Sequence, residues 1–421
     1  MQEAQARHRF ISLRWVGCGV LASALAACGG GGGSDASTQG TLRLAMTDAP
    51  ACGYDHVYVT VDRIRVHQSS GASDADAGWI EMTVSPARRI DLLNLTNGAL
   101  EELGSMPLEA GSYQQIRLVL ADNPANPTPS RPLANALVLE GQNTELALKT
   151  PSGQQSGLKL QAHFDVTGGQ LADLVLDFDA CKSIVKAGNS GNYNLKPVVS
   201  VFKRLTTAIE GYVDPLMASP GTLVSAQQNG VTVRATVPVQ TTGADKGKFT
   251  IAWLPVDTTT GSATYNVVVT GTSRSTAVVT GVPVALSIGK TVLNTASTPI
   301  VPPISTMANV GGVVVNGGGT LLTDATVGAT QALTGGPVIE VGAQRVDALD
   351  ASYLLSLPLA GPVKAPYVAG GPLVFGAADS AAAGKYSLRA GALGYTTQTT
   401  APAVTLGAAG STIAKDLVLA P

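Results

Sequence analysis

Residues 57–66 read VYVTVDRIRV, and this stretch decides the class of the fold. Apolar and polar side chains alternate along it, which is typical of a β-strand with one buried face. Residues 41–46, TLRLAM, show the same alternation. The TDAP that follows at 47–50 contains Asp and Pro, which favour a turn. We therefore expect the folded part of the chain to begin as a β-sheet protein.

The same pattern extends on both sides of this pair of segments. Further strands are predicted at 79–84, 113–121, 136–138, 158–166, 171–178 and 195–202. A short helical or looped piece is predicted at 92–103, and four prolines predict a surface loop at 122–132. Near residue 206, Val, Thr, Gly and Ala become dominant and no cysteine follows. We therefore predict a first β-domain at 40–204.

Two related units are predicted after this boundary, at 206–300 and 306–421. Each contains a strand that ends in Leu-Pro, at Leu254-Pro255 and at Leu357-Pro358. Between the units, STPIVPP at 297–303 predicts a stiff, extended linker. The composition agrees with many short strands joined by tight turns, because the 421 residues include 48 Gly and 24 Pro but only 5% aromatic residues.

The first 27 residues are typical of an export signal. Basic residues near the start precede an apolar run at 15–27, which is too short to span a bilayer. The sequence Leu25-Ala26-Ala27-Cys28 resembles the lipobox of bacterial lipoproteins, in which the cysteine receives the lipid. An ordinary secretory peptide, cleaved after an Ala-x-Ala-like site, is the alternative. Residues 28–39 would then form a lipidated cysteine with a glycine-rich tether.

The predicted location follows from this resemblance. The protein is expected to be exported and held in the cell envelope through a lipid on Cys28. In a Gram-negative host the resemblance implies the outer membrane, because residue 29 is Gly and not the aspartate that retains lipoproteins at the inner membrane.

Cysteine usage predicts a disulfide. After removal of the signal and lipidation of Cys28, only Cys52 and Cys181 are left. Two thiols in an oxidising compartment usually pair, so a Cys52–Cys181 bridge is expected. A free or metal-binding pair is the alternative.

The first β-domain resembles a bacterial lipoprotein family known only as a domain of unknown function, number 4382. The resemblance brings no activity with it. It is carried by residues 41–44, 47–50, 90–95, 110–118, 176–181 and 195–197.

The two later units resemble carboxypeptidase-regulatory-like domains, which are small transthyretin-like sandwiches with a starch-binding-like fold. The last unit departs from the pattern, with Ala351-Ser352-Tyr353 in place of Gly-Lys-aromatic. The expected fold is therefore all-β, with an N-terminal β-sandwich-like domain followed by two small transthyretin-like β-sandwiches. In the first unit the resemblance is carried by Gly211 and Val213, Lys248-Phe249, Leu254-Pro255 and Tyr265.

Charge and motifs exclude several classes of function. With 27 Lys and Arg against 29 Asp and Glu, and no cluster of basic residues, the chain is not expected to bind nucleic acid. It contains no nucleophile elbow, phosphate-binding glycine loop or zinc-protease motif. A triad assembled from distant segments is the alternative to a non-catalytic protein.

One polar set suggests a metal site. His163 and Asp165 would share one face of a strand, as would Asp177 and Asp179. If the two strands formed a hairpin, the four side chains could converge and bind Ca²⁺, the one cofactor that the sequence suggests. A solvated sheet face is the alternative. The predicted disulfide would also bring Asp48, beside the Cys52 turn, close to Asp179.

The sequence supports two main hypotheses for function. The first is a non-catalytic envelope protein that serves as a scaffold, adhesive or ligand-binding module for another envelope protein or a polysaccharide. The second is carbohydrate binding by aromatic rings of the starch-binding-like units, although single aromatic residues on strands usually belong to the core. The aromatic residues concerned are Trp79, Trp253, Tyr212, Tyr265, Tyr353, Tyr367, Tyr386 and Tyr395.

Overall fold

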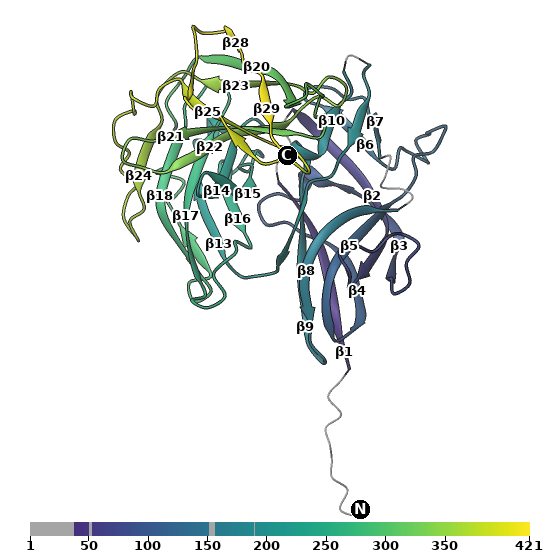
Figure 1. The fold of residues 1–421 in the computed structure, drawn as a ribbon. Helices are drawn as coiled ribbons and strands as arrows, with labels where there is room; N and C mark the ends of the chain where they lie inside the picture. Colours follow the sequence, from purple (N-terminus) through teal and green to yellow (C-terminus); the bar gives the residue numbers. More distant parts are fainter. Residues whose placement is uncertain (1–37, 50–52, 151–155, 189) are drawn as a thin grey trace, which may run out of the picture. The chain divides into compact units, whose positions relative to one another are not determined.

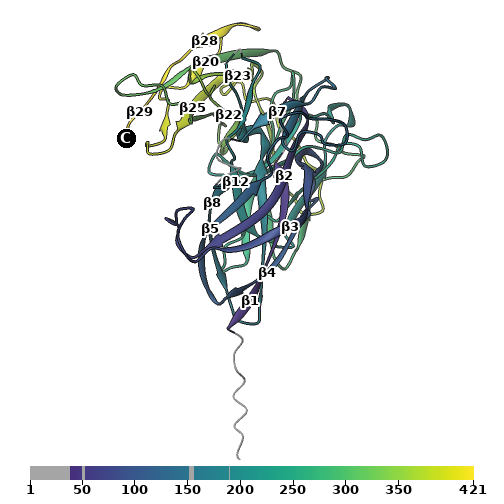
Figure 2. The ribbon, with the colours of Figure 1, turned by 90° about the vertical axis from the view of Figure 1, so that its right-hand side faces the viewer.

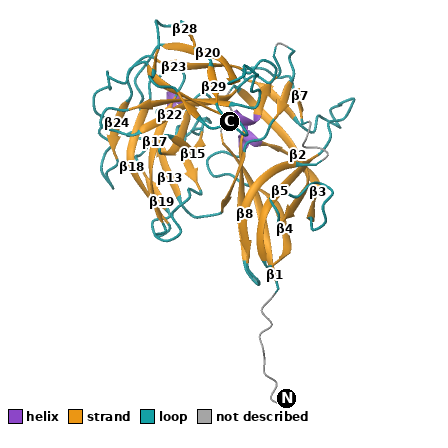
Figure 3. Ribbon diagram, in the orientation of Figure 1, coloured by secondary structure: helices purple, strands orange, loops and turns teal. Residues whose placement is uncertain are grey.

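The structure is a computed structural model that describes residues 38–49, 53–150, 156–188 and 190–421. Within these ranges it is an all-β protein in which strands and loops make up nearly the whole chain (Figure 3). The predicted fold class is therefore confirmed. No helix of the described ranges is long and apolar enough to cross a membrane.

The described residues from 38 to 203 contribute two sheets (Figure 1). The smaller sheet has the order β12 (Val199–Lys203), β9 (Leu171–Asp179), β1 (Gln39–Ala49) and β4 (Glu101–Glu109). The larger sheet has the order β10 (Ile184–Lys186), β11 (Tyr193–Leu195), β7 (Leu146–Lys149), β6 (Ala136–Leu139), β2 (Tyr54–His67), β5 (Gly111–Leu120) and β8 (Leu158–Val166), with β3 (Ile80–Asp91) paired to β2. Short helical turns η1 (Leu92–Asn94) and α1 (Ala180–Ser183) follow β3 and β9. The two sheets share one apolar core.

Strand β2 is the long central strand of the larger sheet and pairs with β3, β5 and β6. Figure 2 shows β3 and β5 on either side of it. Its apolar residues change phase, from Val57, Val59 and Val61 to Ile64 and Val66, and all five are buried. The pairing register shifts between residues 61 and 63, which is a bulge that keeps both halves facing the core. The buried apolar side chains of β2 are therefore the centre of the N-terminal core.

In the described part of the first β-domain, the sequence patterns do not indicate strands β4, β7 and β10. The region predicted as a short helical or looped piece contains η1, but β4 begins at Glu101. The proline-rich segment at 122–132 is a loop, as predicted. The strands predicted at 41–46, 57–66, 113–121, 158–166 and 171–178 are present.

A second pair of sheets forms from the next part of the chain. One sheet has the order β16 (Lys248–Ala252), β13 (Ala208–Tyr212) and β19 (Lys290–Val292). The other has the order β15 (Val231–Thr236), β14 (Leu223–Gln228), β17 (Ser262–Thr270) and β18 (Ala277–Ala285), and a short turn η2 (Pro215–Met217) follows β13. We call this pair of sheets the middle sandwich.

The stretch predicted as a stiff linker, 297–303, instead packs on the middle sandwich. Ile300 is 1% exposed and belongs to its core. Its N–H donates to the Tyr212 carbonyl at 2.8 Å, and its own carbonyl accepts from Asp214 N–H at 3.0 Å. The linker prediction is wrong because an apolar side chain within the proline-rich run supplies core packing.

The last part of the chain forms a third pair of sheets, which we call the C-terminal sandwich. Its strands are β20 (Met307–Asn316), β21 (Thr326–Ala332), β22 (Val338–Arg345), β23 (Ser352–Pro358), β25 (Lys385–Gly391), β26 (Gln398–Thr399), β27 (Val404–Thr405), β28 (Thr412–Ala414) and β29 (Leu417–Leu419). The orders β23-β20-β28 and β22-β21-β25-β26 match β16-β13-β19 and β15-β14-β17-β18 of the middle sandwich. The two units are therefore structural repeats.

The repeats also share a buried tyrosine. The Tyr265 hydroxyl donates to the Pro255 carbonyl at 2.5 Å, and the Tyr386 hydroxyl donates to the Pro358 carbonyl at 2.7 Å. Both rings are 1% exposed. Burial raises the pKa of Tyr265 to about 12. Each repeated Leu-Pro thus lies at the end of a strand (β23) or just beyond it (β16), and a core tyrosine satisfies its proline carbonyl.

Strand β24 (Val363–Pro366) connects the two repeats. It lies between β23 and β25 in sequence, but it pairs in parallel with β18 of the middle sandwich. Ser275 Oγ donates to the carbonyls of Ala360 and Gly361 at 3.0 and 2.7 Å beside this pairing. The five-stranded sheet of the middle sandwich is therefore completed by residues that lie within the sequence of the C-terminal unit.

The shared tyrosine predicts matched losses of stability. Tyr265→Phe and Tyr386→Phe each leave a proline carbonyl without its hydroxyl partner, and we expect each to lower the free energy of unfolding by about 1 to 3 kcal/mol. Denaturant unfolding followed by circular dichroism measures the change. Tyr367→Phe, in a half-buried ring, is the control and should change stability little. Equal stability of all three variants and the parent chain would contradict the assigned role.

Candidate functional site

The candidate site is a cavity at which the three pairs of sheets meet, and we call it the junction cavity. It has a volume of about 440 Å³ and is bordered by β12, β15 and β22. Each of these is the outermost strand of its sheet within the described chain. A second cavity of about 400 Å³ adjoins it and shares the lining residues Lys182, Thr232, Glu340 and Ala343.

A buried ion pair lies beside the junction cavity. Arg234 of β15 and Asp177 of β9 are 5% and 7% exposed, and their Nη2 and Oδ1 atoms are 3.2 Å apart. The guanidinium also lies over the rings of Phe202 and Trp253, with its central carbon 4.8 and 5.6 Å from the ring centres. This cluster joins β9 and β12 of the first β-domain to the middle sandwich.

Burial disfavours the charged forms of both side chains of this pair. Burial raises the pKa of Asp177, although the Arg234 charge acts in the opposite direction. Burial lowers the pKa of Arg234, although the Asp177 charge favours its protonated form. The pair geometry does not qualify as a hydrogen bond, and within the described chain Asp177 Oδ1 and Arg234 Nη1 have no hydrogen-bond partner. The cost of desolvating both ions is therefore only partly offset by their attraction.

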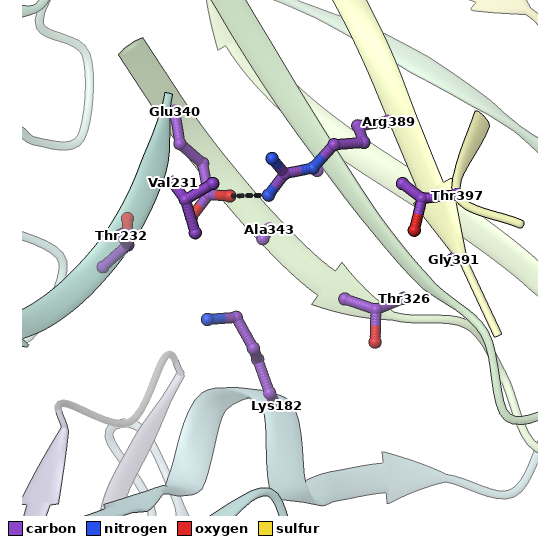
Figure 4. A pocket seen from close by; sticks show the side chains of 10 residues that line it. Lys182, Val231, Thr232, Thr326, Glu340, Ala343, Arg389, Gly391 and Thr397 are labelled. Carbon is purple, nitrogen blue, oxygen red and sulfur yellow. Dashed lines mark hydrogen bonds and ion pairs between the residues drawn. The ribbon is translucent and has the colours of Figure 1, made fainter. Parts of the chain in front are cut away.

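Lys182 lies where the two cavities meet. Asp179 caps helix α1, accepting from Lys182 N–H at 3.0 Å, and its Oδ2 lies 2.8 Å from Lys182 Nζ. Burial opposes the charge of Lys182, but the negative charges of Asp179 and Glu340 outweigh it and raise the pKa of Lys182. Figure 4 shows the second cavity, with the ammonium group of Lys182 pointing into it opposite the Glu340–Arg389 ion pair, whose atoms are 3.1 Å apart.

Asp48 is a buried acid close to this cluster. It is 3% exposed at the end of β1, and its Oδ1 accepts from Ala180 N–H at 3.3 Å. Its Oδ2 has no hydrogen-bond partner in the described ranges. Burial raises the pKa of Asp48 well above its usual range, and the charges of Asp177 and Asp179 add to the effect.

Two side-chain amides form hydrogen bonds between the three parts of the fold. The first is Asn97, which reaches from the first β-domain to the middle sandwich. Its Oδ1 accepts from Thr250 N–H at 3.0 Å, and its Nδ2 donates to the Val237 carbonyl at 2.9 Å. Its backbone N–H donates to Thr236 Oγ1 at 3.0 Å. Asn97 therefore bridges β15 and β16, which belong to opposite sheets of the middle sandwich.

The second amide is Gln227, which is 2% exposed on β14. Its Oε1 accepts from Glu340 N–H at 2.8 Å, and its Nε2 donates to the Glu340 carbonyl at 2.7 Å. This pair of bonds to one residue is what a neighbouring antiparallel strand makes. Gln227 thus attaches β22 of the C-terminal sandwich to the middle sandwich.

The predicted metal site does not form. Strands β8 and β9 belong to different sheets, so they do not make the hairpin on which the convergence depended. His163 and Asp165 are exposed on β8, whereas Asp177 is buried against Arg234 and Asp179 caps α1. Within the described chain, no group of three or more His, Cys, Asp or Glu side chains is arranged to hold a metal ion. The turn after β8 crosses between the sheets because both strands bury side chains in the same core.

The predicted cysteine chemistry stays a prediction. Cys28 and Cys52 lie outside the described residues, and so does the side chain of Cys181. The lipid on Cys28 and the Cys52–Cys181 disulfide are therefore expectations from the sequence alone.

The aromatic residues are mainly used inside the fold. Tyr265, Tyr353 and Tyr386 are buried, and their hydroxyls donate to backbone carbonyls. Trp79 is half-buried, and the guanidinium carbons of Arg65 and Arg117 lie 4.6 Å from its ring centre. These contacts favour the structural interpretation of the rings over a sugar-stacking platform.

Sequence patterns point to Asp177 and Asp179 but miss their partners. Asn97 and Gly98 have positive φ angles of 57° and 81° in a turn closed by Ala99 N–H and the Thr96 carbonyl. An Asn-Gly pair is a known signal for such a turn, so the position of Asn97 was detectable. Gln227 and Arg234 carry no comparable signal, because a polar residue on a strand usually faces solvent.

The Gln227 bridge predicts a loss of coupling between sandwiches. Gln227→Ala leaves the Glu340 N–H and carbonyl unpaired in a buried place, and we expect it to lower the free energy of unfolding by about 1 to 3 kcal/mol. Calorimetry should also show a broadened or divided transition. Gln228→Ala is the matched control, because the neighbouring side chain bonds only to the Thr264 carbonyl within its own sandwich. Equal effects of the two substitutions would contradict the bridging role.

The raised pKa of Asp48 predicts how stability depends on pH. The folded state holds this proton more tightly than the unfolded state, so the associated stability is complete below about pH 4 and is lost as pH rises through the raised pKa. Asp48→Asn stays neutral, so we expect it to melt higher than the parent chain at pH 7.5 and close to it at pH 4. The control is Asp245→Asn, at an exposed position. An equal loss of melting temperature at both pH values for Asp48→Asn would refute this assignment.

No curated protein matches the chain. Similar solved structures include a 3-chlorocatechol 1,2-dioxygenase from Rhodococcus opacus 1CP, at 16% identity and a TM-score of 0.18. The match covers 27% of this chain, which spans 60% of the length of the dioxygenase.

Two pilins are also similar: a streptococcal ancillary pilin at 10% identity and the Corynebacterium diphtheriae major pilin SpaA at 11%. Each match covers 90% of this chain and 99% of the pilin, with a TM-score of 0.18. None of these likenesses bears on function. The predicted resemblance of the first β-domain is confirmed, because residues 39–197 match the family described as a domain of unknown function, DUF4382.

Proposed function

We propose that this protein is a non-catalytic cell-envelope lipoprotein that serves as a rigid surface scaffold and binding module. The observation that carries the proposal is the use of the buried polar groups at the junction. Arg234 forms an ion pair, and Asn97 a hydrogen bond, between the first β-domain and the middle sandwich. Gln227 forms hydrogen bonds between the middle and C-terminal sandwiches. Groups used in this way hold modules in fixed positions, which suits a protein that presents a surface.

The charges of the junction cavity support a binding role over a catalytic one. The cations Lys182 and Arg234 on its wall lie 2.8 and 3.2 Å from a carboxylate, and Arg389 of the adjoining cavity lies 3.1 Å from one. A general base or nucleophile needs a group with free capacity for a proton or an electrophile. Paired charges on the wall of a cavity instead supply fixed hydrogen-bonding groups for a polar ligand.

The location in the envelope rests on the lipobox. Cys28 follows Leu25-Ala26-Ala27 and precedes a run of glycines, so lipid attachment would place the folded body on a flexible tether. The expected partners are another envelope protein or a polysaccharide. The resemblance of the two repeats to carboxypeptidase-regulatory-like domains agrees with this role.

Expression in a bacterial host that processes lipoproteins tests the proposal. The parent chain should sediment with membranes and incorporate an alkyne-labelled fatty acid, because Cys28 is the acceptor of the lipid. Cys28→Ala should be exported without the label and be recovered in the soluble extracytoplasmic fraction. Cys18→Ala, within the apolar run, is the matched control and should behave like the parent. Labelling that persists in Cys28→Ala, or a parent chain without label, would reject the lipoprotein assignment.

A further inference from the structure

We propose that the junction cavity binds an extended peptide segment of a partner protein, which would pair with the open edge of β22. This inference rests on the proposed binding role and names the class of ligand. Open strand edges recognise extended peptides through their backbone N–H and carbonyl groups, whatever the side chains are.

The first observation is the convergence of three sheet edges. Residues of β12, β15 and β22 line the same cavity, and each strand is the outermost of its sheet in the described ranges. Four consecutive residues of β22, 340–343, line the cavity. Neighbouring residues of a strand point to opposite faces, so a run of consecutive lining residues means that the strand presents its edge.

The second observation is that this edge already binds an amide. The carboxamide of Gln227 accepts from Glu340 N–H and donates to the Glu340 carbonyl, at 2.8 and 2.7 Å. A carboxamide has the same donor and acceptor groups as a peptide unit. At Glu340 the carboxamide of Gln227 therefore takes the place of the peptide group of a neighbouring strand. This shows that the edge of β22 can bind an amide through its N–H and carbonyl groups.

The third observation is open space at the next position. A Cβ built on Gly342 meets no atom within 4 Å, and no positive φ restricts this residue. The volume of about 440 Å³ lies in the range of small-ligand sites and suits a short peptide better than a folded domain. Because a Cβ points away from the plane of the sheet, this result shows open space over the face of β22 beside the site held by Gln227, where a side chain of a bound segment can lie.

The charges around the cavity favour a peptide with polar side chains of both signs. Lys182 and Arg234 supply positive groups, and Asp177, Asp179 and Glu340 supply negative ones. An entirely apolar segment would remove the water that hydrogen-bonds to these groups and would offer no hydrogen bonds in its place.

The test uses a phage-displayed random heptapeptide library, selected on the full chain and counter-selected on Gly342→Leu. The leucine fills the open space beside β22, so we expect selected peptides to bind it at least about tenfold more weakly than the parent chain. Gly317→Leu is the matched control, because Gly317 also has no atom within 4 Å of a built Cβ and does not line the cavity. It should bind like the parent, and thermal melting should show that both variants fold.

A second arm tests the mode of binding. A selected peptide is resynthesised with methyl groups on alternate backbone nitrogens, in both phases. Strand pairing requires one phase to lose at least about tenfold in affinity, because its N–H groups face β22, while the other phase is unaffected. Fluorescence anisotropy measures both peptides.

Three results would overturn the proposal. Failure to enrich any peptide over Gly342→Leu would reject the site, and equal tolerance of both methylation phases would reject strand pairing. Enrichment of peptides that copy this chain's own sequence would replace the partner protein by a second copy. None of these results depends on Cys28, so the failure of this inference can be told apart from failure of the lipoprotein assignment.

Discussion

The backbone N–H and carbonyl groups along a buried sheet edge must find hydrogen-bond partners. The way the three pairs of sheets join depends on which groups supply these partners. An unpaired N–H or carbonyl away from water costs free energy comparable to a lost hydrogen bond. Here the partners at two boundaries are side-chain amides. Asn97 bonds to groups near β15 and β16, and Gln227 bonds to Glu340 on β22. A single amide satisfies only one position of an edge, and at β16 the Val239 N–H donates to the Lys248 carbonyl as well.

The ion pair of Arg234 and Asp177 adds specificity to this arrangement more than stability. Burial shifts both pKa values toward the neutral forms, so the attraction only partly offsets the desolvation cost. An unpaired charge at either position would be far more costly. The pair therefore penalises any packing of the middle sandwich on β9 and β12 that separates the two charges.

The two C-terminal sandwiches use one strand order twice, with the buried tyrosine conserved in its contact to a Leu-Pro carbonyl. They differ through β24, which belongs to the second repeat in sequence but extends the sheet of the first. Because a strand pairing of this kind shares a sheet between repeats, the two cannot turn freely about a linker. The apolar contact of Ile300 with the middle core restricts the connecting segment further.

The sequence by itself determined the all-β class, most strands of the first domain and the repeated Leu-Pro segments, because alternation, turn residues and short motifs are local properties. The export signal stays a prediction from the sequence. It also drew attention to Asp177 and Asp179. Only the tertiary structure decided what they do, since β8 and β9 lie in different sheets and the partner of Asp177 is Arg234, 57 residues further along the chain. Which edges meet, and which polar side chains close them, depends on contacts between distant segments that have no local signature.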